Sequence, residues 1–313
     1  YYFRVMVEQG AYNHVTHFYR GKVRDVYRIG EQHILMIASD RISAFDVILP
    51  KLIPYKGQVL NSIAGYMLQE TKRVCDNWLL SMPAGNASLG YRCQPFKVEV
   101  VVRGYLCGHA WRTYQSGQRV LCGAKMPDGL KENDRFPQPL ITPSTKAEAG
   151  HDEDISEAEI IAQGLATKEE WAEIKSKALA LFAAGTAIAA RQGLILADTK
   201  YEFGKKDGRI LLMDEIHTPD SSRYFYADGF AERQQKGERQ KQLSKEFVRE
   251  WLLQNGFSGK AGQQVPHMTD DWVQTISQRY IELYERLTGL QFVPDATTDA
   301  EKLQKINAAI DAL

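Results

Sequence analysis

Short runs of apolar residues alternate with polar ones in the first third of the chain. Three segments have the period-two pattern of strands, with glycine and proline between them: His17–Ile29, Gln32–Ala38 and Phe96–Arg103. The segment Val59–Leu80 has instead the spacing of one amphipathic helix. This pattern predicts a β-rich first domain, residues 1–103, built on a mixed sheet with few helices.

The remaining residues, 104–313, are predicted to mix helices and strands. Between Gly117 and Asp154 the sequence is rich in glycine, proline and charged residues. The run Phe136-Pro137-Gln138-Pro139 lies within it, and proline lacks the backbone N–H that regular structure needs. We therefore expect a long loop there.

Local signals predict the elements that follow this loop. Ser156 with Glu159, and Thr167 with Glu170, match the capping box that opens a helix. The second helix is rich in alanine and is predicted to end near Gln192-Gly193. Strands are predicted at Leu194–Phe203 and Arg209–Ile216, and the chain beyond Leu243 is predicted to be mainly helical, with stop signals at Asn255-Gly256 and Gly289.

Composition narrows the class of protein. The 313 residues include 39 Lys plus Arg and 39 Asp plus Glu, so the formal charge is zero and no global field attracts nucleic acid or anionic lipid. The four cysteines are far apart, which predicts reduced thiols rather than a zinc site. No apolar run approaches the roughly twenty residues of a membrane span, and Tyr1–Gly10 lacks signal-peptide features. These features predict a cytoplasmic protein.

The first segment with candidate chemistry is cationic. Read as one strand, the run from Arg20 to Tyr27 places Arg20, Lys22 and Arg24 on one face. Such a face suits phosphate, but exposed edge strands also carry charges for solubility alone. Both interpretations remain open on these residues.

The second segment carries acids at the end of a predicted hairpin. Asp198, Lys200 and Glu202 follow an apolar run at period two, and Asp214 ends the partner strand. Two carboxylates at strand ends suit Mg²⁺, which takes a few hard oxygen ligands together with water and nucleotide phosphates. A surface ladder of ion pairs is the alternative.

The turn of this hairpin decides whether Glu202 and Asp214 share a face. A two-residue turn at Asp207-Gly208 would pair Glu202 with Met213 and leave Asp214 on the opposite face. A three-residue loop with a bulge at Gly208 would restore them to one face. We expect the longer loop, because joint metal ligation requires it.

Three further segments place polar groups at strand ends, where ligands often bind. Arg223 suits a bidentate contact with phosphate or carboxylate, although it could also be an ordinary exposed arginine. Likewise His217 could be a hydrogen-bonded loop residue. The segments are Ser39–Asp46, Val98–Tyr105 and Asp214–Tyr224.

Taken together, these segments resemble the SAICAR synthetase family, also called phosphoribosylaminoimidazole-succinocarboxamide synthases. Eight strings match in the family's order and cover nearly the whole chain. They are GKVRDVY, SDRISAFD, IPYKGQVLN, VVRGYL, FPQPLITPSTKAE, HDEDIS, LADTKYEFG and MDEIHTPDSSRYF.

The resemblance implies an α+β fold of two lobes. The N-terminal lobe would resemble the nucleotide lobe of kinases and ATP-grasp enzymes, the C-terminal lobe would be mixed α/β, and ATP would bind in the cleft between them. The implied activity is that of a carbon–nitrogen ligase of purine biosynthesis. It joins carboxyaminoimidazole ribonucleotide (CAIR) to L-aspartate and yields SAICAR, ADP and phosphate, through an acyl phosphate.

The resemblance also implies roles for individual residues. Lys22, Lys200 and Arg223 are expected to take part in catalysis. In the nucleotide site, Lys22 and Arg24 would hold ATP phosphates, the strand around Glu99 would offer backbone groups to adenine, Lys200 would lie beside the nucleotide, and Glu202 and Asp214 would bind Mg²⁺. The substrate-binding residues would be Ser43, Asp46, Arg103, His109, Lys146, Asp152, Ser222 and Arg223, with Lys146 and Asp152 toward the aspartate.

The sequence departs from the family at one place. Many members carry a serine after the glycine in the segment that follows VVRGYL, whereas this chain has His109 after Gly108. The imidazole of His109 could replace the hydroxyl, backbone amides could suffice, or His109 could simply pack against Trp111.

Two other functions fit part of the pattern. A small-molecule kinase would use the same phosphate-binding strand and acidic hairpin, but the chain lacks a catalytic-loop signature such as H-R-D. A nucleotide- or RNA-binding module is suggested only by the cations near Lys22, and zero net charge argues against it. We expect a monomer or small homo-oligomer that binds small molecules, with no nucleic-acid or membrane partner.

Overall fold

The computed structural model describes residues 11–146 and 152–313, so Tyr1–Gly10 and part of the predicted Gly117–Asp154 loop, residues 147–151, lie outside the described residues. The chain has the α+β composition predicted and divides into two compact units. The first comprises the chain up to Tyr66, Trp78–Arg92 and Lys245–Leu313; the second comprises Met67–Asn77 and Cys93–Ser244. This division differs from the predicted single boundary at residue 103, because the C-terminal helices make their contacts with the N-terminal segments.

The first unit is built on a five-stranded sheet whose described strands pair antiparallel throughout, not as the mixed sheet predicted. The predicted strand His17–Ile29 is two strands joined by a turn. In the order β1-β2-β3-β7-β6 the strands are β1 (Val15–Arg20), β2 (Arg24–Ile29), β3 (His33–Ala38), β7 (Ala87–Tyr91) and β6 (Leu79–Ala84); a separate hairpin joins β4 (Ser43–Ala44) and β5 (Val47–Ile48).

The helices of the first unit are α1 (Lys56–Glu70), α6 (Glu246–Gln254), α7 (Asp270–Thr288) and α8 (Asp299–Asp311); the division between the units falls within α1. The helix predicted over Val59–Leu80 is wrong in its second half. The Thr71 hydroxyl donates to the Met67 carbonyl at 2.6 Å, and two turn hydrogen bonds from Val74 and Cys75 return to the Thr71 carbonyl. These bonds close a local turn where the predicted helix would have continued, and α1 ends at Glu70.

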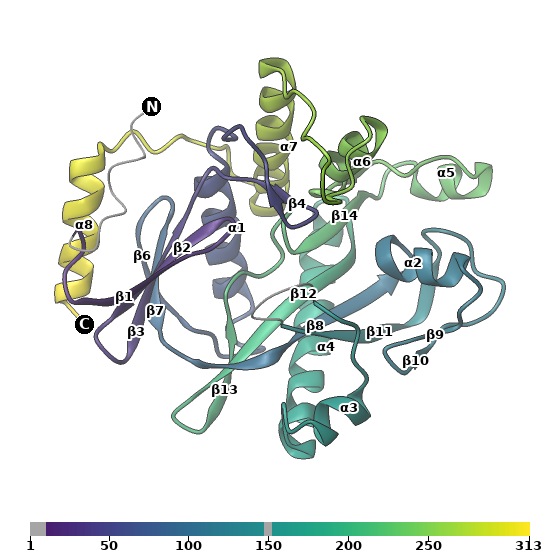
Figure 1. Cartoon of the computed structure of the whole chain (residues 1–313), viewed down its shortest axis with the longest axis horizontal. Coiled ribbons are helices and arrows are strands. Elements are labelled where there is room, and N and C mark those ends of the chain that lie inside the picture. Colours follow the sequence, from purple (N-terminus) through teal and green to yellow (C-terminus); the bar gives the residue numbers. More distant parts are fainter. Residues whose placement is uncertain (1–10, 147–151) are drawn as a thin grey trace. The chain divides into compact units, whose positions relative to one another are not determined.

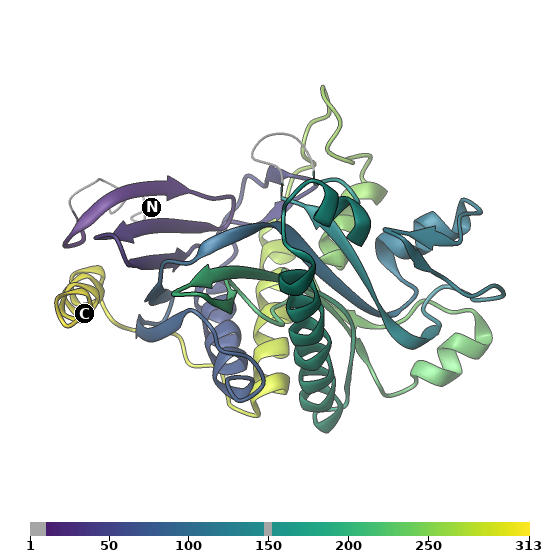
Figure 2. The same ribbon diagram turned by 90° about the horizontal axis from the view of Figure 1, so that it is seen from below.

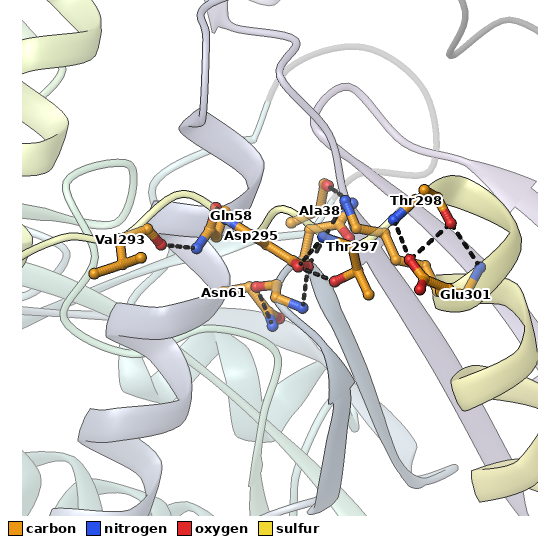
Figure 3. Close-up of polar contacts among 11 residues, drawn as sticks. Ala38, Gln58, Asn61, Val293, Asp295, Thr297, Thr298 and Glu301 are labelled. Atoms are coloured by element: carbon orange, nitrogen blue, oxygen red, sulfur yellow. Dashed lines mark hydrogen bonds and ion pairs between the residues drawn. The ribbon is translucent and has the colours of Figure 1, made fainter.

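The last helix, α8, is held by the segment that precedes it. Gln58 of α1 donates to the Val293 carbonyl and accepts from the Asp295 N–H, both at 2.9 Å (Figure 3). Thr298 and Glu301 then form a capping box that opens α8. Ile306 and Ile310 of this helix are buried in one cluster with the apolar side chains of the sheet, so α8 forms part of the core of this unit.

The second unit contains a six-stranded antiparallel sheet (Figure 1). Its long central strand β12 pairs with β8 on one side and with β14 and then β13 on the other. The strands are β11 (Arg135–Thr145), β8 (Gln94–Tyr105), β12 (Leu194–Lys206), β14 (Ser222–Tyr226), β15 (Gln242–Leu243) and β13 (Arg209–Met213); β9 (Val120–Leu121) and β10 (Ala124–Lys125) form a separate hairpin.

Helix α4 packs against β12 and β8 of this sheet (Figure 2). Both predicted capping boxes are confirmed, at Ser156 and at Thr167. The helices are α2 (Gly108–Gln115), α3 (Glu157–Ala162), α4 (Lys168–Arg191) and α5 (Phe230–Lys236). No helix in the described part of the chain is long and apolar enough to cross a membrane.

The predicted loop Gly117–Asp154 is wrong over much of its described length, where β9, β10 and β11 form. Pro137 and Pro139 lie inside β11. They are tolerated because β11 is at the edge of the sheet, where one side of the strand needs no partner, and because its register with β8 shifts between Arg135 and Leu140.

A close approach between α4 and a buried histidine gives a stability prediction. A Cβ on Gly185 would lie 2.2 Å from His217 Cε1. The His217 ring is fully buried and its Nε2 hydrogen bonds to the Tyr201 hydroxyl at 2.7 Å, so it cannot move aside cheaply. We expect Gly185→Ala to lower the free energy of unfolding by about 1–3 kcal/mol, even though alanine favours helix more than glycine does. Urea denaturation measures this change.

The control is Ala183→Gly, at an exposed position of α4, which measures the effect of helix propensity alone. An unchanged or raised stability of Gly185→Ala would show that no such clash exists.

Candidate functional site

Charged side chains gather on one face of the sheet in the second unit. Val98, Val100 and Val102 of β8 are buried, and the residues between them point to the opposite face. Glu99 pairs directly with Glu202 across the strands, and Arg103 pairs with Asp198. Directly opposed residues of antiparallel strands share a face, so these four side chains lie on the same side of the sheet.

One end of this face holds two arginines around a single carboxylate. Asp198 Oδ2 accepts from Arg103 Nη1 at 3.1 Å and from Arg223 Nη1 at 3.2 Å. Arg103 Nε also donates to the Thr142 hydroxyl at 2.8 Å. All three charged side chains are nearly buried, at 9–12% exposure. Two cations around one anion leave an excess positive charge, which suits an anionic ligand group.

The other end holds an acid–lysine cluster, which we define as Glu99, Lys146, Lys200, Glu202 and Asp214. Lys200 Nζ donates to Glu99 Oε1 at 2.6 Å and to Glu202 Oε1 at 3.0 Å. Lys146 donates to the other carboxylate oxygen of Glu202, Oε2. The cluster therefore presents two ammonium groups and their carboxylates side by side.

The charges of this cluster set its pKa values. Burial by itself would raise the pKa of Glu202, but Lys200 and Lys146 outweigh it and lower that pKa to about 2. Burial raises the pKa of Glu99 against the opposing charge of Lys200. Burial disfavours the charged amine of Lys200, yet Glu202 and Glu99 raise its pKa well above the ordinary value. At neutral pH, Glu202 is therefore ionised and Lys200 is cationic.

The expected three-residue hairpin loop is wrong. Lys206 pairs with Arg209 and Glu202 with Met213, which leaves a two-residue turn of Asp207 and Gly208. Both turn residues have positive φ, 51° and 75°, as in a type I′ turn. This outcome counts against Glu202 and Asp214 sharing a face through strand alternation.

Asp214 nevertheless acts on the same lysines as Glu202. It follows the end of β13 and has a φ of 56°, so the chain leaves the strand before alternation can decide its direction. Burial disfavours charge on Lys146, but Glu202 and then Asp214 outweigh it, and the pKa of Lys146 is raised. Asp214 also contributes to the raised pKa of Lys200 after burial, Glu202 and Glu99. The charge of Asp214 therefore influences both lysines from beyond the end of β13.

Two other predicted residues of this sheet have structural partners. Strand β8 lies between β11 and β12, so the backbone of Glu99 is bordered by strands on both sides, and the structure does not support the predicted backbone contact with adenine. The hydroxyl of Ser222 is buried and hydrogen bonds to that of Thr199 at 2.7 Å. Glu99 therefore contributes its side-chain carboxylate to the acid–lysine cluster. The Ser222 hydroxyl is a buried structural partner of Thr199, next to Arg223 in the sequence.

In the first unit, the cationic segment is a turn rather than one strand. Gly21 N–H donates to the Arg24 carbonyl at 2.8 Å, and Lys22 lies in the turn between β1 and β2. Because Arg20 pairs with Asp25, Arg24 points to the opposite face from Arg20. The predicted common face of three cations is therefore wrong, and Lys22 forms an ion pair with Asp46.

Arg41, to which the sequence assigned no role, supports this turn. Its guanidinium donates to the Gly21 carbonyl at 3.1 Å, to the Lys22 carbonyl at 3.3 Å and to Asp25 Oδ1 at 2.7 Å. Its partners are two turn carbonyls and the buried carboxylate of Asp25, and only the folded structure shows that they meet Arg41. Arg41 thus orients the turn that carries Lys22.

Ser43 and Asp46 belong to the small β4–β5 hairpin of the first unit. Ser43 is buried, whereas Asp46 lies in the turn with a φ of 62°. Of the two, only Asp46 has an exposed side chain that a ligand could reach, and that side chain forms an ion pair with Lys22.

His109 is paired rather than packed against Trp111. Its Nε2 lies 2.7 Å from Asp154 Oδ2, and both side chains are about half exposed, at 43% and 47%. Trp111 stacks instead on Tyr114. Asp152, the neighbouring candidate, is exposed.

Two members of the arginine end were given no site role from the sequence, although Asp198 was noted on its strand. Asp198 has the same parity as Lys200 and Glu202, which was a usable signal, but nothing local showed that two arginines from other strands meet it. Cys107 accepts a hydrogen bond from Arg223 Nη1 at 2.8 Å, across 116 positions of sequence. The pairing of β8 and of β14 with β12 brings these residues together.

Comparison with known proteins identifies the family of the chain. The sequence profile of the SAICAR synthetase family matches residues 17–266. The phosphoribosylaminoimidazole-succinocarboxamide synthase of Bacteroides fragilis is 61% identical over 92% of this chain and 92% of its own length. That of Cytophaga hutchinsonii is 58% identical over 93% and 94%. The SAICAR synthase of Saccharomyces cerevisiae, solved in complex with SAICAR, is 33% identical with a TM-score of 0.77, over 91% of this chain and 98% of that one. The resemblance seen in the sequence motifs is confirmed, and the chain belongs to the SAICAR synthetase family.

Proposed function

We propose that this chain is the ATP-dependent ligase that joins CAIR to L-aspartate and releases SAICAR, ADP and phosphate. Family membership and one observation support this assignment. A single sheet face carries an arginine pair with excess positive charge at one end and an acid–lysine cluster at the other. A nucleotide substrate with an anionic group and a triphosphate donor need these two kinds of site.

The reaction must activate a carboxylate, which is a poor electrophile. A carboxylate oxygen of CAIR attacks the γ-phosphorus of ATP, the bond to the β-γ bridging oxygen breaks, and ADP leaves. The neutral amine of aspartate then attacks the acyl carbon of the acyl phosphate; phosphate leaves and the amine loses a proton. The protein contributes chiefly positioning and charge neutralisation to both steps.

The two lysines of the acid–lysine cluster are suited to different parts of the reaction. Lys200 is held between Glu99 and Glu202, so its ammonium group has a defined position and keeps its charge at neutral pH. We assign Lys200 to the transferred phosphoryl group and Lys146, which is more exposed, to the incoming aspartate. Asp152 remains a second candidate for the aspartate.

Glu202 and Asp214 are the residues that would hold Mg²⁺. Glu202 is ionised, and the charges of both acids act on the same two lysines, so each acid can supply a hard oxygen ligand to this cluster. Within the described residues no group of three His, Cys, Asp or Glu side chains is placed to hold a metal. Two carboxylates fit Mg²⁺ better than a complete protein cage, because this ion usually keeps water and takes nucleotide phosphates as further ligands. When bound, it would neutralise charge on the phosphates.

The first unit is assigned to the nucleotide in this proposal, as a lobe resembling those of kinases and ATP-grasp enzymes. Lys22 would contact phosphate from its turn, released from Asp46, and Arg24 would assist from the start of β2. Asp46 would then be available to the imidazole nucleotide, with Ser43 inside the same hairpin. The proposal keeps the cytoplasmic location and the monomeric or small homo-oligomeric state expected from the sequence.

ADP release measured with purified protein tests the proposal. Sustained formation of ADP and SAICAR over many turnovers is expected only when CAIR, L-aspartate, ATP and Mg²⁺ are all present. Sustained ADP formation without aspartate, with a stable phosphate ester as product, would identify a kinase, and the absence of ADP under every condition would indicate a binding protein.

Arg223→Lys is expected to raise the KM for CAIR about tenfold while the KM for ATP changes less than twofold. Lysine keeps the charge but loses the planar fork that lies between Asp198 and the ligand. Initial-rate kinetics with each substrate varied in turn measure this difference. An effect confined to ATP would move Arg223 to the nucleotide site.

A further inference from the structure

The guanidinium of Arg223 rests against the first residues of α2. Arg223 projects from β14, and its Nη1 donates to Asp198 Oδ2 at 3.2 Å and to Cys107 Sγ at 2.8 Å. Its side chain is 11% exposed. Asp198 supplies the negative charge beside the Arg223 guanidinium. Its Oδ2 also accepts from Arg103, however, so this one oxygen does not by itself fix the position of the Arg223 guanidinium.

Gly108 leaves the space that this guanidinium occupies. A Cβ at Gly108 would lie 2.6 Å from Arg223 Nη1 and 2.7 Å from Nη2. Real Cβ atoms do not approach other atoms this closely, so any other residue at position 108 would displace the guanidinium. Gly108 also has a φ of 58°, which glycine adopts readily and other residues rarely do.

Gly117, at the other end of the same helix, shows that this proximity is specific. It has a φ of 94°, yet nothing lies within 4 Å of the position of its missing Cβ. Glycine is therefore needed at position 117 only because of the positive φ. At position 108 it is needed both for the positive φ and because Arg223 approaches so closely.

Cys107 supplies a neutral partner to the same guanidinium nitrogen that donates to Asp198. It occupies the N-cap position of α2, but its side chain makes no capping hydrogen bond. The sulfur instead accepts from Arg223 and lies 3.7 Å from Asp198 Oδ2, to which the thiol donates. Burial raises the pKa of this thiol to about 12, against the lowering effect of Arg223, so it stays protonated and adds no negative charge.

We propose that Cys107 and Gly108 are positioning residues that hold the Arg223 guanidinium for the anionic group of the ribonucleotide substrate. Cys107 acts through a hydrogen bond, and Gly108 acts by leaving room. The inference rests on the proposed function, because it assumes that Arg223 contacts the ribonucleotide. A neutral thiol in this place keeps the excess positive charge of the two arginines, which an aspartate or glutamate there would cancel.

A purely structural role for Cys107 predicts a different outcome. Cys107 is buried with Ala197 and Phe225 in a small apolar cluster. If packing were its whole contribution, an apolar residue of similar volume would serve equally well. Any loss would then appear as lower stability, and the affinities for ribonucleotide and ATP would change together.

Steady-state kinetics of Cys107→Val and Cys107→Ser separate these roles. Valine is close to cysteine in volume but cannot accept a hydrogen bond, and serine can. We expect Cys107→Val to raise the KM for CAIR about tenfold, with less than twofold changes in the KM for ATP and in kcat. Cys107→Ser should restore the KM for CAIR to within about threefold of the unsubstituted protein. Calorimetric Kd values for CAIR without aspartate provide a second readout of the same affinity.

The glycine is tested by Gly108→Ala against Gly117→Ala. Both substitutions place an L-residue at positive φ, one at the start of α2 and one just after its end, so thermal unfolding should detect a loss in each. Only Gly108→Ala should also raise the KM for CAIR by tenfold or more, because only its Cβ displaces Arg223. This pair keeps the inference testable if Cys107→Val does not fold.

Two results would overturn the inference while leaving the proposed function in place. One is a Cys107→Val protein that ligates CAIR with an unchanged KM. The other is an equal rise in the KM for CAIR in Gly108→Ala and Gly117→Ala. Absence of CAIR ligation by the unsubstituted protein would instead contradict the proposed function itself.

Discussion

Asp214→Asn is expected to reduce kcat on the order of 100-fold, and to raise the Mg²⁺ concentration needed for half-maximal rate, without unfolding the protein. Loss of one of two carboxylate ligands weakens the charge neutralisation of the phosphates, and a loss of about 3 kcal/mol of transition-state stabilisation corresponds to this factor. The rate should be measured at saturating ATP and CAIR while Mg²⁺ is varied.

The fold should tolerate this change for a local reason. Asp214 has a φ of 56°, and asparagine is one of the few residues that adopts the left-handed region without much strain. The lysines that Asp214 influences keep Glu202 as a direct partner. The melting temperature is therefore expected to change by only a few degrees.

Asp207→Asn is a matched control on the same hairpin. Asp207 also has positive φ, 51°, and its side chain is 73% exposed at the turn. This variant removes the same charge with the same backbone requirement, and its kcat and Mg²⁺ dependence should equal those of the unsubstituted protein. Normal activity of Asp214→Asn with unchanged Mg²⁺ dependence would remove Asp214 from the metal site.

Asp198→Asn is expected to lower the free energy of unfolding by about 3 kcal/mol, because it leaves two nearly buried arginines without their anionic partner. The same change should raise the KM for CAIR, since Arg103 and Arg223 lose the group that orients them. Urea denaturation and initial-rate kinetics measure the two effects separately.

Inorganic phosphate provides a further readout for this variant. If the two arginines receive an anionic group, phosphate should raise the melting temperature of Asp198→Asn more than that of the unsubstituted protein, since a ligand stabilises the state that binds it. Asp76→Asn is the control, because Asp76 pairs with Arg209 at 3.4 Å where both side chains are exposed; its stability should change by less than about 0.5 kcal/mol. An Asp198→Asn protein as stable as this control would show that the buried ion pairs contribute nothing.

Much of the local structure could be predicted from neighbouring residues alone. The capping boxes at Ser156 and Thr167 form as predicted because their hydrogen bonds join residues three positions apart. Asp198, Lys200 and Glu202 share a face because alternation along a strand is a property of its backbone. The Asp207-Gly208 pair is a local signal for a two-residue turn, and that turn forms. The prediction of a three-residue loop failed because it gave metal ligation more weight than this signal.

The failures in the first lobe and in the proline-rich segment have a different cause. Whether prolines end a strand depends on whether that strand lies at the edge of a sheet, and β11 owes its edge position to its pairing with β8. The division of the chain likewise depends on helices after residue 245 packing on strands near the N-terminus. No property of residues close in sequence specifies such pairings.

The amino-acid sequence by itself determined the family, the helix starts and the set of charged residues on β12. Tertiary structure decided which residues meet, Arg223 with Cys107 and Lys146 with Glu202, and it placed the charge of Asp214 where it influences Lys146. The reason is physical, since hydrogen bonds and ion pairs depend on distances of a few ångströms that only the packing of remote strands creates.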